Sequence, residues 1–172
     1  SSVQAIGIDL GGTKIRAAIV ENGSLISRAV QVETPETPAL ILESLVNLIE
    51  TLRTDRVTGV GIATAGVVNT LTGQVVGSTG NLPGWEGTRV KEIIESRVKL
   101  PVQVENDANA AAYCESKIEE LRDKKCIVVI TLGTGIGGGI IIDGNLYRGT
   151  VWGAGEIGHM RISLSEDRHC AG

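Results

Sequence analysis

The chain repeats one local pattern, in which an apolar strand leads into a glycine-rich turn, a second apolar strand and a tight turn. In the first copy the strands are Val3–Asp9 and Ile15–Val20, and the tight turn is Glu21-Asn22-Gly23. In the second copy the strands are Cys126–Leu132 and Ile136–Ile142. Runs of β-branched residues favour strands, and Asn-Gly or Asp-Gly pairs favour hairpins. The repeat therefore predicts two related hairpin units that face a shared cleft.

The segments between the two copies carry alternating helix and strand signals. Apolar spacing predicts a helix that begins after Thr37 as N-cap and ends near Arg53. Further helices are expected over residues 88–98 and 108–121, each next to strand-forming runs. Those predicted strands are Leu25–Val32, Val57–Ala63, Val67–Asn69, Gln74–Gly77 and Pro101–Glu105. These element types predict an α/β fold.

Composition excludes several classes of protein. The 16 basic and 20 acidic residues provide no electrostatic footprint for a nucleic-acid backbone. No apolar stretch reaches the roughly 18 residues that a membrane span requires. Three cysteines without CxxC spacing indicate reduced thiols and a cytoplasmic location, with Cys126 expected to be buried. The 23 glycines among 172 residues are nearly double the usual share of about 7%, so their positions need an explanation.

The first glycine turn has the composition of an anion site. It reads Asp9-Leu10-Gly11-Gly12-Thr13-Lys14 at the end of a predicted strand. Glycines allow backbone N–H groups to converge on phosphate, while Thr13 and Lys14 add a hydroxyl and a cation. Asp9 can hold a divalent cation through water. The alternative is an ordinary hairpin turn that Asp9 caps.

The second glycine turn contains a formal GxGxxG at Gly133, Gly135 and Gly138, with Thr134 inside it. A dinucleotide-binding fingerprint must open a helix. Here the glycines lead into the apolar run that ends at Ile142, which predicts a strand. We therefore expect a phosphate-binding hairpin instead of a nicotinamide site.

Two polar clusters carry candidate chemistry. Asn106 and Asp107 join a predicted strand to a predicted helix, so Asp107 can cap that helix or act as a general base in the crevice at the strand ends. Asn106 can donate to and accept from a sugar hydroxyl. Glu156 and His159 can share a sugar-binding surface. His159 and Cys170 can alternatively be two ligands of a zinc site, for which His169 is a candidate third ligand or a surface residue.

Together these motifs resemble the ROK family of repressors, open reading frames and sugar kinases. The resemblance rests on Asp9–Lys14, Glu105-Asn106-Asp107, Leu132–Gly139 and Gly155-Glu156-Ile157-Gly158-His159, and extends over essentially the whole chain. It implies an actin-like, ribonuclease-H-like ATPase fold of the hexokinase type, with the first lobe and part of the second. The first lobe would span residues 1–120, and the start of the second would span residues 121–172.

The resemblance also implies a reaction, namely the ATP- and magnesium-dependent phosphorylation of a hexose at its 6-hydroxyl, with Asp107 as general base. The sugar contacts would be Asn81, Asn106, Asp107, Glu156 and His159. The phosphate contacts would be Asp9, Gly11, Gly12, Thr13 and Lys14 in the first turn and Gly133, Thr134 and Gly135 in the second. The sequence Gly80-Asn81-Leu82-Pro83-Gly84-Trp85 is similar to the glucokinase branch and favours glucose, with N-acetylmannosamine and N-acetylglucosamine as alternatives.

The sequence departs from the family pattern in two ways. The CxCGxxGC zinc motif is incomplete, since His169-Cys170-Ala171-Gly172 lacks its CxC pair, which leaves His159 and Cys170 as the candidate zinc ligands. ROK proteins are also considerably longer, which predicts a fragment of a longer protein that forms a homodimer. The alternatives are a sugar-responsive transcriptional regulator and a non-catalytic sugar-binding fragment.

Overall fold

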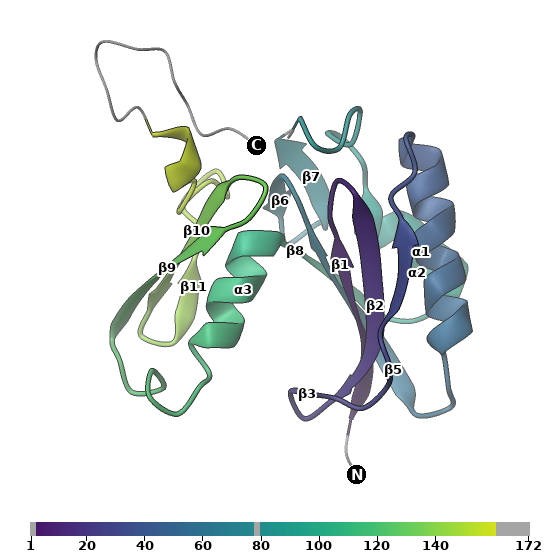
Figure 1. Cartoon of the computed structure of the whole chain (residues 1–172), viewed down its shortest axis with the longest axis horizontal. Helices are drawn as coiled ribbons and strands as arrows, with labels where there is room; N and C mark the ends of the chain where they lie inside the picture. The colour runs from purple at the N-terminus through teal and green to yellow at the C-terminus, as the bar shows by residue number, and fades with distance from the viewer. Residues whose placement is uncertain (1–2, 78–79, 161–172) are drawn as a thin grey trace. The chain divides into compact units, whose positions relative to one another are not determined.

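The computed structural model describes residues 3–77 and 80–160. The chain forms two compact units, Ser1–Asn106 and Asp107–Gly172 (Figure 1). The predicted lobe boundary after residue 120 stays a prediction, and the compact units are divided between Asn106 and Asp107. The helix that begins at Asp107 packs on the sheet of the second unit, and it therefore belongs with that sheet.

A six-stranded sheet forms the centre of the first unit. Its strands are β1 Gln4–Leu10, β2 Lys14–Glu21, β3 Ser24–Leu25, β4 Val30–Glu33, β5 Val57–Thr64 and β8 Val102–Asn106. The order is β3-β2-β1-β5-β8, with β4 also paired to β2. β1 and β2 are antiparallel, whereas β1, β5 and β8 are parallel. The predicted strands β6 Val67–Asn69 and β7 Gln74–Gly77 pair with each other in a separate antiparallel hairpin.

Two helices pack with this sheet, α1 Pro38–Leu52 and α2 Val90–Val98, and they lie side by side in Figure 1. The predicted start of α1 is confirmed, because the Thr37 hydroxyl accepts a hydrogen bond from the Leu40 N–H at 3.4 Å and Pro38 follows directly. Apolar side chains at helical spacing bury one face of α1, namely Ile41, Leu45, Val46, Leu48 and Ile49. This face joins strands β1, β2 and β5 in the main hydrophobic core.

The second unit is a three-stranded antiparallel sheet with one helix. It contains α3 Asp107–Glu115, β9 Cys126–Leu132, β10 Ile136–Ile142, β11 Asn145–Tyr147 and the 3₁₀ helix η1 Ile157–His159. Its buried core is small and contains Ala112, Ile127 and Ile141. α3 packs so closely on β10 that a Cβ at Gly139 would stand 2.4 Å from the Ala112 Cβ. Glycine at position 139 avoids this clash and permits the close packing. No helix in the described parts of the chain is long and apolar enough to cross a membrane.

The predicted internal repeat is confirmed in register. In the first copy Leu10 pairs with Ile15 next to the glycine turn, and in the second copy Leu132 pairs with Ile136. Both tight turns place two successive residues at positive φ, Asn22-Gly23 at 51° and 79° and Asp143-Gly144 at 49° and 77°. These angles suit two-residue hairpins, which explains the Asn-Gly and Asp-Gly pairs.

The equivalent strand faces differ in what covers them. Ile8 and Ile130 each lie two residues before the last residue of the first strand of their hairpin. Ile8 is only 3% exposed in the main core, whereas Ile130 is 58% exposed. The neighbouring Val128 and Leu132 of β9 are exposed as well. In this 172-residue chain the same pattern of apolar residues is therefore buried in one unit and exposed in the other.

Two element predictions and one burial prediction need correction. The expected strand Leu25–Val32 is split into β3 and β4, because the Ser27 hydroxyl accepts the hydrogen bond of the Ile19 N–H at 2.9 Å in place of a backbone carbonyl. The expected helix over residues 108–121 ends at Glu115, after which the Ser116 hydroxyl donates to the Tyr113 carbonyl at 2.7 Å. Cys126 is exposed instead of buried. β11 was not predicted, since its three residues carry no strand pattern.

The matched pair Ile8 and Ile130 provides a test of the packing. In the 172-residue chain, we expect Ile8→Ala to lower the free energy of unfolding by about 2–5 kcal/mol, because it leaves a cavity in a closed core. Ile130→Ala should change it by less than about 0.5 kcal/mol, because the side chain is solvent-exposed. Urea unfolding followed by circular dichroism measures both values. Equal losses for the two variants would contradict the described burial.

Candidate functional site

The parallel pairing of β1, β5 and β8 places their carboxyl ends in one row. Leu10 is the register partner of Thr64, and Thr64 is the register partner of Asn106. The residues that follow these strand ends are the first glycine turn, Gly66 and Asp107. Ligands of open α/β sheets bind at the carboxyl ends of the strands. The predicted site segments of the first unit therefore leave the sheet at the edge where ligands are expected.

The first glycine turn is held by a hydrogen bond within it and by two hydrogen bonds from Thr34. The Gly11 N–H donates to the Lys14 carbonyl at 3.0 Å. Thr34 contacts the turn twice, since its hydroxyl donates to the Gly11 carbonyl at 2.7 Å and its N–H donates to the Thr13 carbonyl at 2.9 Å. Thr13 and Lys14 are exposed, and so is Asp9 at the end of β1. The turn thus presents a hydroxyl, a cation and a carboxylate to solvent on a fixed backbone.

The loop that carries Asn81 is anchored by two wholly buried side chains, Leu82 and Trp85. The indole Nε1 of Trp85 donates to the hydroxyl of Thr64 at 3.0 Å, a buried hydrogen bond to the carboxyl end of β5. No sequence motif indicated a role for Thr34, Thr64 or Trp85. The tryptophan within a Gly/Pro loop was the one available signal, because aromatic residues make up only 2% of the chain.

Asn106 is buried at the end of β8. Its side-chain Nδ2 donates to the Gly66 carbonyl at 2.8 Å, and its N–H donates to Glu105 Oε1 at 2.9 Å. The amide group therefore fixes the turn that follows β5. The predicted contact of Asn106 with a sugar hydroxyl stays a prediction.

Three of the predicted sugar contacts lie in the second unit, at the start of α3 and around η1. Asp107 is exposed, and its Oδ1 accepts a hydrogen bond from the Ala108 N–H at 2.8 Å. Glu156 Oε2 lies 3.5 Å from His159 Nε2. Burial raises the pKa of Glu156, the positive charge of His159 opposes this shift, and the charge of Asp107 adds to it. The pKa shift therefore links Glu156 electrostatically to both Asp107 and His159.

Glycines of the second glycine turn and of β10 have separate structural tasks. The Gly133 N–H donates to the Gly135 carbonyl at 3.0 Å, and a Cβ at Gly133 would meet no described atom within 4 Å. Gly133 and Thr134 are exposed, so a ligand can approach this turn. In contrast, a Cβ at Gly138 would stand 2.7 Å from the Gly155 carbonyl oxygen. Because β10 follows the turn directly, the strand predicted in place of a helix is confirmed.

The two predicted metals place different demands on the chain. Of the two predicted zinc ligands, His159 is described, and Cys170 lies outside the described residues. Within the described ranges, no group of three or more His, Cys, Asp and Glu side chains is placed to hold a metal ion. Magnesium in phosphoryl-transfer sites needs only one or two carboxylates, because substrate phosphates and water supply the other ligands. The exposed carboxylate of Asp9, beside the first glycine turn, fits that requirement.

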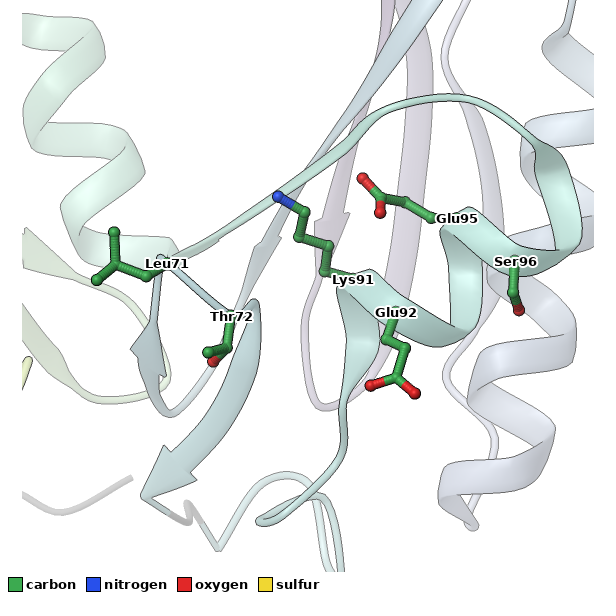
Figure 2. A pocket seen from close by; sticks show the side chains of 6 residues that line it. All are labelled: Leu71, Thr72, Lys91, Glu92, Glu95 and Ser96. Atoms are coloured by element: carbon green, nitrogen blue, oxygen red, sulfur yellow. The ribbon is translucent and has the colours of Figure 1, made fainter.

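A pocket of about 430 Å³ lies elsewhere in the first unit (Figure 2). Leu71 and Thr72, from the turn between β6 and β7, line one side, and Lys91, Glu92, Glu95 and Ser96 of α2 line the other. None of the predicted site residues lines this pocket. It is therefore separate from the row of strand ends.

Comparison with known proteins identifies several sugar kinases. The chain is 43% identical over 158 residues to a glucokinase of Streptomyces coelicolor, a match that covers 91% of this chain and 49% of the relative. It is 33% identical to an N-acetyl-D-glucosamine kinase of Aliivibrio fischeri, with 92% and 52% covered. It is 36% identical to an N-acetylmannosamine kinase of Salmonella arizonae, with 90% and 53% covered. The chain thus spans about half the length of the curated relatives it matches.

Solved structures show the same fold. A ROK family glucokinase from Streptomyces griseus, in complex with glucose and AMPPNP, superposes with a TM-score of 0.85 at 38% identity, covering 98% of this chain and 54% of that one. A ROK family transcriptional regulator, a homologue of the E. coli MLC protein, superposes with a TM-score of 0.81 at 27% identity, covering 98% and 44%. The predicted actin-like α/β fold of the hexokinase type is confirmed by these neighbours. The ROK family model matches residues 5–172, and the chain therefore belongs to the ROK family.

Proposed function

We propose that this protein is a sugar kinase that transfers the γ-phosphoryl group of ATP to the 6-hydroxyl of a hexose, with glucose as its main substrate. The observation that carries the proposal is the position of Asp107. Its exposed carboxylate follows the last residue of β8, at the strand edge where α/β sheets bind ligands. The glucokinase relatives favour glucose, and the two N-acetylhexosamine kinases keep those sugars as alternatives.

Asp107 would act as the general base. As the 6-hydroxyl oxygen attacks the γ-phosphorus, a new P–O bond forms, the bond to the leaving ADP breaks, and the hydroxyl proton passes to the Asp107 carboxylate. The hydrogen bond from the Ala108 N–H to Oδ1 orients this carboxylate. Positioning and charge stabilisation supply most of the catalysis in phosphoryl transfer, so the orientation of the base matters more than a shifted pKa.

The two glycine turns would hold the phosphates. Backbone N–H groups of Gly12 and Thr13, with the Lys14 ammonium, suit the negative charge in the first turn, while Gly11 closes the turn through its own hydrogen bond to the Lys14 carbonyl. The second turn would provide further donors at Thr134 and Gly135, since the Gly133 N–H already donates to the Gly135 carbonyl. Asp9 would hold Mg²⁺ through water, and the ion neutralises charge on the phosphate oxygens when bound.

The sugar would be held by Asn81, Asn106, Glu156 and His159. The Glu156–His159 pair offers both an acceptor and a donor, which matches the hydroxyl groups of a hexose. The proposal also includes a zinc ion held by His159 and Cys170. It further includes a cytoplasmic location and a homodimer.

A sugar-responsive regulator is the second candidate, because a ROK transcriptional regulator has the same fold at 27% identity. Both candidates bind sugar, and only the kinase needs a base for the hydroxyl proton. Catalytic turnover therefore separates them.

Substitution of the base is the most direct test of the kinase. In the protein that carries this chain, we expect Asp107→Asn to lower kcat for glucose by about 10²–10⁴-fold and to leave the glucose KM nearly unchanged. A coupled assay of ADP release measures both constants. The exposed Asp55 is a matched control, because Asp55→Asn makes the same chemical change away from the site. Full activity in Asp107→Asn would contradict the mechanism.

A panel of sugars tests the substrate. We expect kcat/KM to be highest for glucose and lower for N-acetylglucosamine and N-acetylmannosamine, measured as phosphate transferred from ATP. A higher kcat/KM for an N-acetylhexosamine than for glucose would show that the N-acetylhexosamine is the main substrate. No transfer to any hexose, with sugar binding retained, would favour the regulator.

The raised pKa of Glu156 predicts a pH-dependent stability. A raised pKa means that the folded state holds the proton more tightly than the unfolded state, so Glu156 stabilises the fold at low pH and loses this contribution as the pH rises through its folded pKa. We therefore expect Glu156→Gln to have a Tm close to the unmodified protein near pH 4 and a higher Tm at pH 7. Thermal unfolding at both pH values measures this. Glu119→Gln, at an exposed position, is the control and should not raise the Tm at pH 7. A Tm difference between Glu156→Gln and the unmodified protein that shrinks from pH 4 to pH 7 would contradict the raised pKa of Glu156.

A further inference from the structure

Gly12 of the first glycine turn lies directly against Asn81. A Cβ built on Gly12 would stand 2.8 Å from both the Cβ and the backbone oxygen of Asn81, closer than real Cβ atoms approach other atoms. One of these contacts is backbone and cannot rotate away. Any side chain at position 12 therefore requires the Asn81 backbone to move.

The backbone conformation of Gly12 does not itself require glycine. Eight described glycines have positive φ, and Gly12 is not among them. Burial does not require glycine at position 12 either, because Gly12 is exposed. The close approach of Asn81 is the feature at this position that excludes a larger residue.

The loop on the other side of this contact cannot easily retreat. Leu82 and Trp85 are buried in the main core, and the Trp85 N–H donates to the Leu82 carbonyl at 3.2 Å. The Trp85 indole is tied to Thr64 at the end of β5, next to β1 in the sheet. Asn81 is therefore held between the turn at Gly12 on one side and the buried anchor residues Leu82 and Trp85 on the other.

We propose that Gly12 is a positioning residue for the sugar, which sets the place of Asn81 by close contact while Trp85 and Thr64 hold the loop from the core. The proposal rests on the assignment of Asn81 as a sugar contact in the proposed function. It adds that the first glycine turn contributes to sugar affinity even when no nucleotide is bound. Gly12 and Asn81 lie in the same compact unit, so the contact is local to one core.

The first test measures glucose binding alone, by calorimetry and without nucleotide, in the protein that carries this chain. We expect Gly12→Ala to weaken glucose binding by about tenfold, because displacement of a binding group by a fraction of an ångström to 1 Å is costly. Gly61→Ala is a matched control, since a Cβ at Gly61 meets nothing within 4 Å and its φ is not positive. It should bind glucose like the unmodified protein.

A double-mutant cycle shows whether the effect passes through Asn81. Once Asn81→Ala has removed the amide, we expect Gly12→Ala to weaken glucose binding by less than about twofold further. Additive losses, or a Gly12→Ala protein with unchanged glucose affinity and only a raised KM for ATP, would overturn the positioning role. Absence of glucose binding in the unmodified protein would instead contradict the proposed function itself.

A second pair of variants tests the anchor and does not depend on Gly12→Ala folding. Thr64→Val removes the acceptor of the Trp85 indole, whereas Thr64→Ser keeps a hydroxyl at that place. We expect the Val variant to lose several-fold in glucose affinity and the Ser variant to retain it. Equal affinities in the two variants, with both folded by thermal unfolding, would overturn the anchoring role.

Discussion

Parallel pairing of β1, β5 and β8 is the constraint on which the arrangement of the first unit depends. Because parallel strands run in the same direction, Leu10, Thr64 and Asn106 end in one row, and three separate segments leave the sheet at one edge. The Trp85 indole and the Asn106 amide then bond to this row, at Thr64 and at the Gly66 carbonyl. Groups far apart in the sequence are thereby brought together by the backbone register of the sheet.

The many glycines serve two different physical purposes. Some allow backbone segments to approach each other, as Gly139 does against Ala112 and Gly138 against the Gly155 carbonyl. Others provide the tight turns, where Gly23 and Gly144 have positive φ. Gly12 belongs to the first kind although its surroundings suggested an anion turn. A glycine motif therefore identifies a place of close approach, and only the three-dimensional neighbours show what approaches it.

Features encoded within a few residues could be predicted from the sequence, and features that depend on distant partners could not. The two hairpins, the start of α1 at Thr37 and the strand after Gly135 follow from local pattern and turn chemistry. The end of α3 at Glu115 and the break at Ser27 each coincide with a single hydroxyl group that hydrogen-bonds to the backbone. The Trp85–Thr64 bond joins residues 21 positions apart, and Thr34 reaches the turn at Gly11 across 23 positions. Periodicity carries no information on such pairs.

The first compact unit is continuous in the chain and contains the main hydrophobic core, whereas the described core of the second unit is small. A ribosome releases the N-terminal residues first, and domains generally fold as units during synthesis. All strands of the six-stranded sheet are therefore available before α3 is translated. The sheet edge that carries the first glycine turn can be complete when Asp107 emerges, so the order of synthesis matches the order in which this half of the site is assembled.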